Sequence, residues 1–252
     1  KLKRAFERDE LLVHYQPKYN LKTGEVFGAE ALVRWELPER GLILPSDFIP
    51  IAEETNLIIE IGEWVLDKVC EDFRLWQRSA GSPGRVSVNL SLKQLRQRNF
   101  IERIGSIMRG HELSPTSLEL EITETTLMED PERTIKLLDQ LYGLGLHLAI
   151  DDFGTGYSSL SALQQFPIST LKIDKSFVSS MREDPQDLEL VKIMIHIAHR
   201  FGLTVVAEGV EDRASAEMLR DLGCDYGQGY FFSRPLPTDE FEHWLREWPG
   251  RV

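Results

Sequence analysis

The sequence predicts an α/β fold, a (β/α)8 barrel of the TIM type with one antiparallel strand near the N-terminus. Eight short β-rich segments occur within 252 residues, and segments with helical periodicity separate most of them, which is typical of parallel βαβ units. The first two β-rich segments are joined by a connection too short for a crossover helix, so we expect an antiparallel hairpin there. A doubly wound open sheet is the alternative, but no G-x-G-x-x-G motif follows an early strand.

The predicted elements follow one another in a regular order. We expect strands at 11–19, 27–35, 85–91, 117–123, 146–151, 169–174, 203–210 and 225–232. Helical periodicity is found at 58–76, 131–144, 188–202 and 214–223, and each of these segments closes near a Gly or a Trp. No linker or low-complexity segment divides the chain, so we interpret residues 1–252 as a single domain.

The composition limits the possible partners and the cellular location. A net charge of −12 argues against a nucleic-acid polymer as ligand, because such binding depends on arrays of Lys and Arg. No apolar stretch reaches the ~18 residues of a membrane span, and the charged first ten residues lack the apolar centre of a signal peptide. We therefore expect a cytoplasmic domain without direct membrane insertion, even if the full-length protein is membrane-tethered. The start without Met predicts excision from a larger multidomain protein.

Polar residues recur on the inward face of the predicted strands. Side chains alternate along a strand, so in 117–123 Leu118 and Leu120 face the helices while Glu119 and Glu121 face the barrel interior. By the same rule seven strands direct one polar residue each to the C-terminal mouth, where barrel enzymes hold their reacting groups. These residues are Glu30, Asn89, Glu121, Asp151, Lys172, Glu208 and Gln228, with less clear alternation for the last two.

Carboxylates gathered in one place need a cationic partner, because burying unpaired charges is costly. Oxygen ligands without His or Cys indicate Mg²⁺ or Mn²⁺ in preference to Zn²⁺. Two such ions form the type of site that holds the attacking and departing oxygens in phosphoryl displacement. We expect Asp151, at the end of its strand, to bridge two ions, and Asp152, already in the following glycine-containing loop, to turn back and bind one of them.

Two further acidic residues have simpler interpretations. Glu119 also faces inward, and we predict a structural salt bridge for it deep in the barrel. Asp174 either contacts a ligand or caps the following helix, and the sequence leaves both possibilities open.

Several motifs resemble, in order, those of the EAL-domain family of cyclic di-GMP phosphodiesterases. They are EALVR (30–34), NLS (89–91), EITE (121–124), DDFGTGYSS (151–159), LKID (171–174), AEGVE (207–211) and QGY (228–230). The likeness runs from Tyr15-Gln16-Pro17 to Ser233-Arg234-Pro235, which is almost the whole chain. It implies a barrel enzyme that uses two Mg²⁺ or Mn²⁺ ions to open cyclic di-GMP to linear pGpG.

The resemblance also implies roles for individual residues. Metal ligands of the family match Glu30, Asn89, Glu121 and Asp151, with Asp152 on the second metal. Lys172 and Glu208 match groups that hold or activate the attacking water, and Glu208 is either a base or a metal ligand. Glu124 matches a residue that anchors the Asp-Asp loop. Contacts to the substrate are expected from Gln16, Leu32, Arg34, Asp174, Gln228 and Pro235.

The resemblance further implies a homodimer, whose partner subunit adjusts the loop at 152–159, and a regulatory or sensory domain in cis. The main alternative is a catalytically silent cyclic di-GMP receptor, which the loss of metal ligands would mark. None is lost here. An unrelated barrel enzyme that acts with Mg²⁺ on an enolisable substrate would not require the Asp-Asp-Phe-Gly loop.

Overall fold

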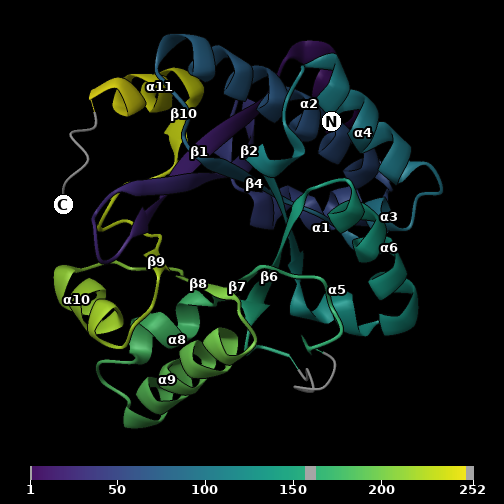
Figure 1. Ribbon diagram of the computed structural model, residues 1–252. Coiled ribbons are helices and arrows are strands. Elements are labelled where there is room, and N and C mark those ends of the chain that lie inside the picture. Colours follow the sequence, from purple (N-terminus) through teal and green to yellow (C-terminus); the bar gives the residue numbers. More distant parts are fainter. Residues whose placement is uncertain (1, 157–162, 248–252) are drawn as a thin grey trace.

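Eight strands close into a barrel at the centre of the molecule (Figure 1). The computed structural model describes residues 2–156 and 163–247. Around the barrel the strands are ordered β1, β9, β8, β7, β6, β5, β4 and β2, and β2 pairs again with β1. The predicted (β/α)8 barrel is therefore confirmed. Its strands are β1 (Leu11–Asn20), β2 (Val26–Leu37), β4 (Arg85–Asn89), β5 (Leu118–Thr123), β6 (His147–Phe153), β7 (Thr170–Ile173), β8 (Thr204–Ala207) and β9 (Tyr226–Gly227).

The antiparallel strand is β1. It runs antiparallel to β2, with His14 opposite Leu32, and antiparallel to β9, with Tyr19 opposite Gly227. All other neighbouring pairs of barrel strands are parallel. The short connection after Asn20 forces this arrangement, because only a hairpin fits it. Two short strands that we did not predict extend the sheet, β3 (Gly41–Ile43) on β2 and β10 (Leu236–Pro237) on β1.

Helices form the outer layer (Figure 1). The four predicted helices are present as α2 (Leu57–Ser79), α6 (Pro131–Gly143), α9 (Pro185–Arg200) and α10 (Arg213–Asp221). Asp130, Asp184 and Asp212 cap the last three, each accepting a hydrogen bond from a backbone N–H of the first turn. The other helices are α1 (Pro45–Glu54), α3 (Leu92–Leu95), α4 (Phe100–Gly110), α5 (Glu124–Met128), α8 (Lys175–Ser180) and α11 (Thr238–Glu247), with 3-10 turns at Leu2–Arg4, Phe6–Arg8 and Pro115–Ser117.

The hydrophobic core lies between the barrel and its helices. Leu118, Leu120 and Ile122 of β5 are buried on the helix-facing side, while Glu119 and Glu121 of the same strand are buried inside the barrel. Burial on both faces explains why polar residues inside the barrel need partners of their own.

The last barrel strand is shorter than we predicted, because β9 ends at Gly227. Beyond it the chain turns, and Phe231 N donates a hydrogen bond to Val210 O. A Cβ atom at Gly229 would lie 2.1 Å from that same oxygen, so the close approach requires glycine.

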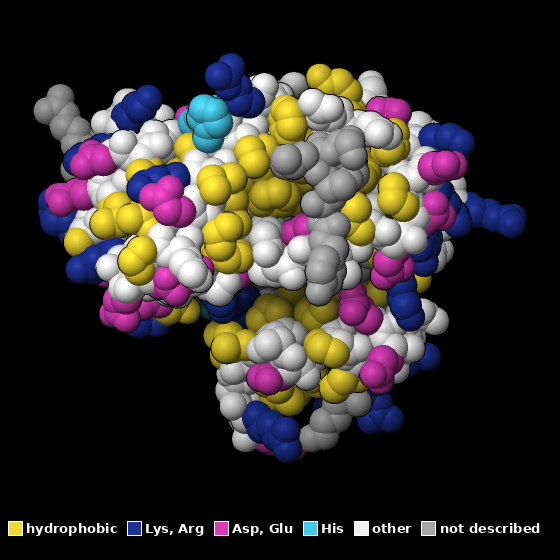
Figure 2. All heavy atoms as spheres, turned by 90° about the horizontal axis from the view of Figure 1, so that it is seen from below, with side chains coloured by type: hydrophobic (Ala, Val, Ile, Leu, Met, Phe, Trp, Pro, Cys, Tyr) yellow, Lys and Arg dark blue, Asp and Glu magenta, His cyan; other side chains and the backbone are white. Residues whose placement is uncertain are grey.

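None of the helices within 2–156 and 163–247 is long and apolar enough to cross a membrane. On the face seen in Figure 2, acidic and basic side chains are interspersed.

Candidate active site

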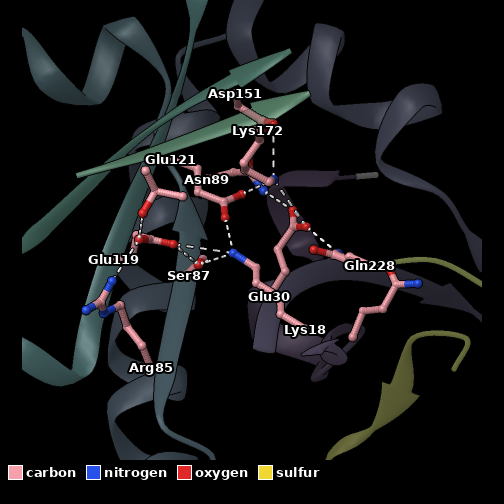
Figure 3. A network of polar contacts seen from close by, with 12 residues as sticks. Lys18, Glu30, Arg85, Ser87, Asn89, Glu119, Glu121, Asp151, Lys172 and Gln228 are labelled. Atoms are coloured by element: carbon pink, nitrogen blue, oxygen red, sulfur yellow. Dashed lines mark hydrogen bonds and ion pairs between the residues drawn. The ribbon is translucent and has the colours of Figure 1, made fainter. Parts of the chain in front are cut away.

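Acidic side chains of β2, β5 and β6 surround one lysine at the C-terminal mouth of the barrel (Figure 3), together with Glu208, which directly follows β8. Lys172 Nζ, from β7, lies 2.5 Å from Glu121 Oε2, 2.7 Å from Glu208 Oε1, 3.1 Å from Asp151 Oδ1 and 3.4 Å from Glu30 Oε2. Lys172 is fully buried. We call Lys172 and the carboxylates around it the rim cluster, which comprises Glu30, Glu121, Asp151, Asp152, Lys172 and Glu208.

Asp151 and Asp152 reach the rim cluster through an irregularity in β6. The pairing of β6 with β7 shifts register between Ile150 and Phe153, and Asp152 has a left-handed φ of 53°. Such a bulge changes the alternation, so consecutive side chains need not point to opposite faces. One oxygen each of Asp151, Asp152 and Glu208 lie within 4.8 Å of one another. Our placement of Asp152 in a loop after the strand is therefore wrong, because β6 continues to Phe153.

Amide side chains hold Glu30 from two sides (Figure 3). Asn89 Nδ2 donates to Glu30 Oε1 at 2.8 Å, and Gln228 Nε2 donates to Glu30 Oε2 at 2.7 Å. Gln228 Nε2 also donates to Gln16 Oε1 at 3.0 Å. The other atom of the Gln228 amide, Oε1, is buried and finds no hydrogen-bond partner among the residues that the structure describes.

Glu124 lies at the start of α5, beneath the loop that follows β6. Its Oε2 atom accepts hydrogen bonds from Gly154 N at 2.9 Å and from Gly156 N at 3.2 Å. Gly154 has a φ of 100°, a conformation that favours glycine. These contacts place Glu124 where the resemblance implies a loop anchor. Residues 157–162 of that loop lie outside the described residues.

A cavity of about 320 Å³ lies beside the rim cluster. It brings together six residues that we predicted for the site, namely Gln16, Glu30, Leu32, Asp151, Glu208 and Gln228. Lys175 and Tyr230 also line it, although we did not predict them. Their positions directly after LKID and at the end of QGY were the signal that could have identified them.

Three of the predicted substrate contacts do not line this cavity. Arg34 Nη1 donates to Val33 O at 2.8 Å, and Pro235 is half-buried near β10. Asp174 caps α8, with its Oδ1 atom accepting from Ser176 N at 3.0 Å. The cap is one of the two possibilities that the sequence left open for Asp174.

A second polar group lies deeper in the barrel, below the rim cluster (Figure 3). Lys18 Nζ, on β1, contacts Ser87 Oγ at 2.5 Å, Glu121 Oε1 at 2.6 Å and Glu119 Oε1 at 3.4 Å. Glu119 Oε2 accepts from Thr170 Oγ1 at 2.7 Å and from Arg85 Nη1 at 3.2 Å. The structural salt bridge predicted for Glu119 is confirmed. We call this group the lower layer, which comprises Lys18, Arg85, Ser87, Glu119 and Thr170.

Lys18 is a buried charge inside the barrel that sequence reasoning missed. The alternation along 11–19 places it on the same face as Gln16, two residues earlier, and that spacing was the available signal.

The pKa values show that the rim cluster carries an excess of negative charge. Burial, with repulsion from Asp151 and Glu30, raises the pKa of Glu208 to about 8. Burial and the neighbouring Asp151 and Asp174 raise the pKa of Asp152 to about 6. Glu30 also has a raised pKa, owing to burial and to repulsion from Glu121. One lysine therefore does not balance these carboxylates, and the site favours additional cations.

The comparison with protein families decides between the possible kinds of barrel. The family model of the EAL domain matches residues 1–235. This chain belongs to the EAL-domain family.

Relatives of this EAL domain include proteins of cyclic di-GMP signalling. A bifunctional diguanylate cyclase/cyclic di-GMP phosphodiesterase of Pseudomonas aeruginosa, MucR, is 42% identical over 239 residues, which are 95% of this chain and 35% of MucR. The cyclic di-GMP phosphodiesterase PdeR of Escherichia coli is 39% identical over 251 residues, which are 100% of this chain and 38% of PdeR. The chain thus spans about a third of the length of these curated relatives.

The fold of this EAL domain matches that of solved relatives. The structure of the MucR phosphodiesterase in complex with c-di-GMP superposes with a TM-score of 0.93 at 42% identity, covering 95% of this chain and 97% of that one.

Proposed function

We propose that this EAL domain hydrolyses cyclic di-GMP to linear pGpG, with two Mg²⁺ or Mn²⁺ ions bound at the rim cluster. The observation that carries the proposal is the convergence of four carboxylates on one lysine beside a cavity, with the carboxylate of Asp152 next to two of them. A relative that is 42% identical forms a complex with c-di-GMP, which supports the choice of ligand. The relatives' greater length supports a regulatory or sensory domain in cis, and a homodimer stays a prediction.

The residues of the rim cluster fit divalent cations. All the donors are carboxylate or amide oxygens, which Mg²⁺ and Mn²⁺ prefer. Lys172, with a further contact from Lys18 to Glu121, does not balance five carboxylates, and divalent ions would offset the remaining negative charge. Glu30, Asn89, Glu121 and Asp151 would hold the first ion. Asp151, Asp152 and Glu208, whose oxygens are already within 4.8 Å of one another, would hold the second.

Bound ions would supply Lewis acidity, which stabilises charge on the phosphate and lowers the pKa of water. The residues of the chain supply orientation and proton transfer. In the proposed reaction a water oxygen bonds to phosphorus as the bond from phosphorus to the 3′ oxygen breaks, which leaves a 5′-phosphate on pGpG. The water gives up a proton to a carboxylate, and the departing 3′ oxygen takes one up.

Lys172 and Glu208 are the groups best placed for these tasks. The pKa of Lys172 lies well above its usual range because attraction to Asp151, Glu121 and Glu208 outweighs the effect of burial. Lys172 therefore stays protonated and can donate a hydrogen bond to the water or the phosphate. Glu208 serves either as the proton acceptor or as a ligand of the second ion. Asn89 and Gln228 fix the orientation of the Glu30 carboxylate between them.

The cavity would suit a phosphodiester once cations are bound, because four of its lining residues are acidic, namely Glu30, Asp151, Glu208 and Glu211. Lys175 adds a positive charge to the cavity wall, and Gln16, Leu32 and Gln228 lie on the side of the ligand. We propose that Arg34 and Pro235 contact the substrate from outside the cavity described here, that Asp174 serves as the cap of α8, and that Glu124 holds the loop after β6 in place.

Incubation of the purified domain with cyclic di-GMP tests the proposal directly. Chromatography should show pGpG in the presence of Mg²⁺ or Mn²⁺ and none in the presence of EDTA. Binding of cyclic di-GMP without product would support the receptor alternative. Neither binding nor product under any of these conditions would contradict both functions.

A further inference from the structure

Lys18 is placed to control the orientation of a carboxylate at the mouth, although it lies below the rim cluster and does not line the cavity beside it (Figure 3). We infer that Lys18 is a positioning residue, which holds Glu121 Oε1 inside the barrel so that Oε2 is presented to the cation site. The inference rests on the proposed function, because Glu121 is a cation ligand only within it.

The contacts divide Glu121 between two lysines. Lys18 Nζ lies 2.6 Å from Glu121 Oε1, while Lys172 Nζ lies 2.5 Å from Glu121 Oε2. The Lys18 side chain is only 1% exposed, and Ser87 Oγ contacts its ammonium group at 2.5 Å. Because each oxygen of Glu121 contacts a lysine, the carboxylate cannot rotate about χ3 without losing a charge-assisted hydrogen bond.

Neutralising Glu119 does not account for the position of Lys18. Its ammonium group is closer to Glu121, at 2.6 Å, than to Glu119, at 3.4 Å. Glu119 has partners of its own, because Thr170, Ser87 and Arg85 all donate to its carboxylate. Lys18 therefore acts mainly on Glu121, as a hydrogen-bonding partner of a metal ligand does.

A double variant separates positioning from net charge. Lys18→Met combined with Glu119→Gln removes one positive and one negative charge, so the total charge of the barrel interior stays that of the wild type. The donor to Glu121 Oε1 is lost, together with the contacts of Lys18 to Ser87 and Glu119 and the ion pair of Glu119 with Arg85, none of which reaches the rim cluster. Calorimetric titration with Mn²⁺ in the absence of substrate should show affinity weakened about 10- to 100-fold, the usual effect of losing a partner of a metal ligand. Lys22→Met, an exposed substitution after the same strand, is the matched control and should bind Mn²⁺ as the wild type does.

A second readout distinguishes this role from general damage to the fold. Raising the Mn²⁺ concentration should recover hydrolysis by the double variant, and KM for cyclic di-GMP should stay close to the wild-type value at saturating Mn²⁺. If Lys18→Met with Glu119→Gln does not fold, Lys18→Gln with Glu119→Gln takes its place with the same expected weakening. The glutamine is neutral and about one bond too short to reach Glu121 from the position of the lysine.

The outcomes are separable from those of the proposed function. A folded double variant that binds Mn²⁺ within about 3-fold of the wild type would overturn the role of Lys18 and leave the phosphodiesterase proposal intact. Failure of the wild type itself to bind Mn²⁺ and to form pGpG would overturn both.

Discussion

The lower layer and the rim cluster occupy the same barrel and use the same residue types, but they balance charge differently. In the lower layer Glu119 is met by Lys18, Arg85 and Thr170, and the pKa of Glu119 is below its usual value although burial alone would raise it. In the rim cluster Lys172 contacts four carboxylates and Asp152 lies beside them, and burial and mutual repulsion raise the pKa of Glu208, Asp152 and Glu30.

Glu121 belongs to both regions and shows how they are connected. Attraction to Lys172 and Lys18 outweighs the effect of burial and lowers the pKa of Glu121 to about 2. A buried polar group with balanced partners supports the fold, whereas an unbalanced group of acids is typical of a site that awaits a ligand. We therefore infer that the lower layer stabilises the fold and that the rim cluster carries out the proposed reaction.

The largest expected effect comes from Asp151→Asn in the rim cluster. The substitution keeps the shape of the side chain but removes a charge that the proposed cations need. We expect kcat for cyclic di-GMP hydrolysis to fall by about 10²- to 10³-fold or more, the usual loss for one group that stabilises the transition state. Thermal unfolding in EDTA should stay at the wild-type temperature or rise, because the excess of negative charge is smaller.

Glu30→Ala should lower kcat to a similar extent and serves as a second variant of the rim cluster, although the loss of an acceptor for Asn89 and Gln228 should also lower its thermal midpoint. Hydrolysis at the wild-type rate by either variant would contradict the assignment of chemistry to the rim cluster.

Glu119→Ala in the lower layer should have the opposite effects, lowering thermal stability while leaving kcat nearly unchanged. It leaves Arg85 without its carboxylate partner and takes one acceptor from Lys18. Removing one member of a buried ion pair costs about 3 kcal/mol or more. The thermal midpoint measured by calorimetry should therefore fall by about 6–12 °C. We expect kcat to stay within about 10-fold, since Glu119 lies outside the cavity.

The control for this prediction is the mild variant Glu119→Gln, which keeps a polar group in place. A loss of activity by Glu119→Ala as large as that of Asp151→Asn would remove the distinction between the two regions.

Stability should depend on pH in a way that identifies the rim cluster. Glu208 has a pKa of about 8 in the folded protein and near 4.5 when unfolded, so the folded state binds its proton more tightly. Between these values the unfolded state loses the proton first, and stability falls as pH rises. The thermal midpoint in EDTA should decrease by about 3–6 °C from pH 5.5 to pH 8.5.

Cations and the lower layer should modify this pH dependence in predictable directions. Mn²⁺ should reduce the decrease, because a bound cation lowers the pKa of the carboxylates. The lowered pKa values of Glu119 and Glu121 contribute stability above pH 4.5 that is lost only in more acidic solution. A midpoint in EDTA that rises between pH 5.5 and pH 8.5 would show that the acids of the rim cluster are balanced after all.

Much of the fold could be predicted because alternation along the strands and the lengths of the connections are local features of the sequence that recur along the chain. Alternation along β5 correctly placed Glu119 and Glu121 inside the barrel, and the short connection after Asn20 correctly predicted the antiparallel β1. The end of β9 could not be predicted, because it depends on the packing of Gly229 against Val210.

The acidic residues of the site could be predicted from the sequence, but the position of Asp152 and the presence of Lys18 could not. A bulge brings Asp152 to the rim cluster, and alternation alone carries no signal for a bulge. Lys18 was missed because lysine is almost never fully buried unless it is paired, and its partners come from β4 and β5, far away in the sequence.

The smallest expected effect concerns Asp174, which the sequence assigned either to the ligand or to a helix cap. Its Oδ1 atom accepts from Ser176 N at the start of α8, and serine caps helices about as well as aspartate does. We expect Asp174→Ala to lower the free energy of unfolding by about 1 kcal/mol and Asp174→Ser to change it by less than about 0.5 kcal/mol. Because Asp174 does not line the cavity, KM for cyclic di-GMP should change by less than about 3-fold in Asp174→Ser. A 10-fold rise in KM with unchanged stability would assign Asp174 to substrate binding and extend the functional region beyond the rim cluster.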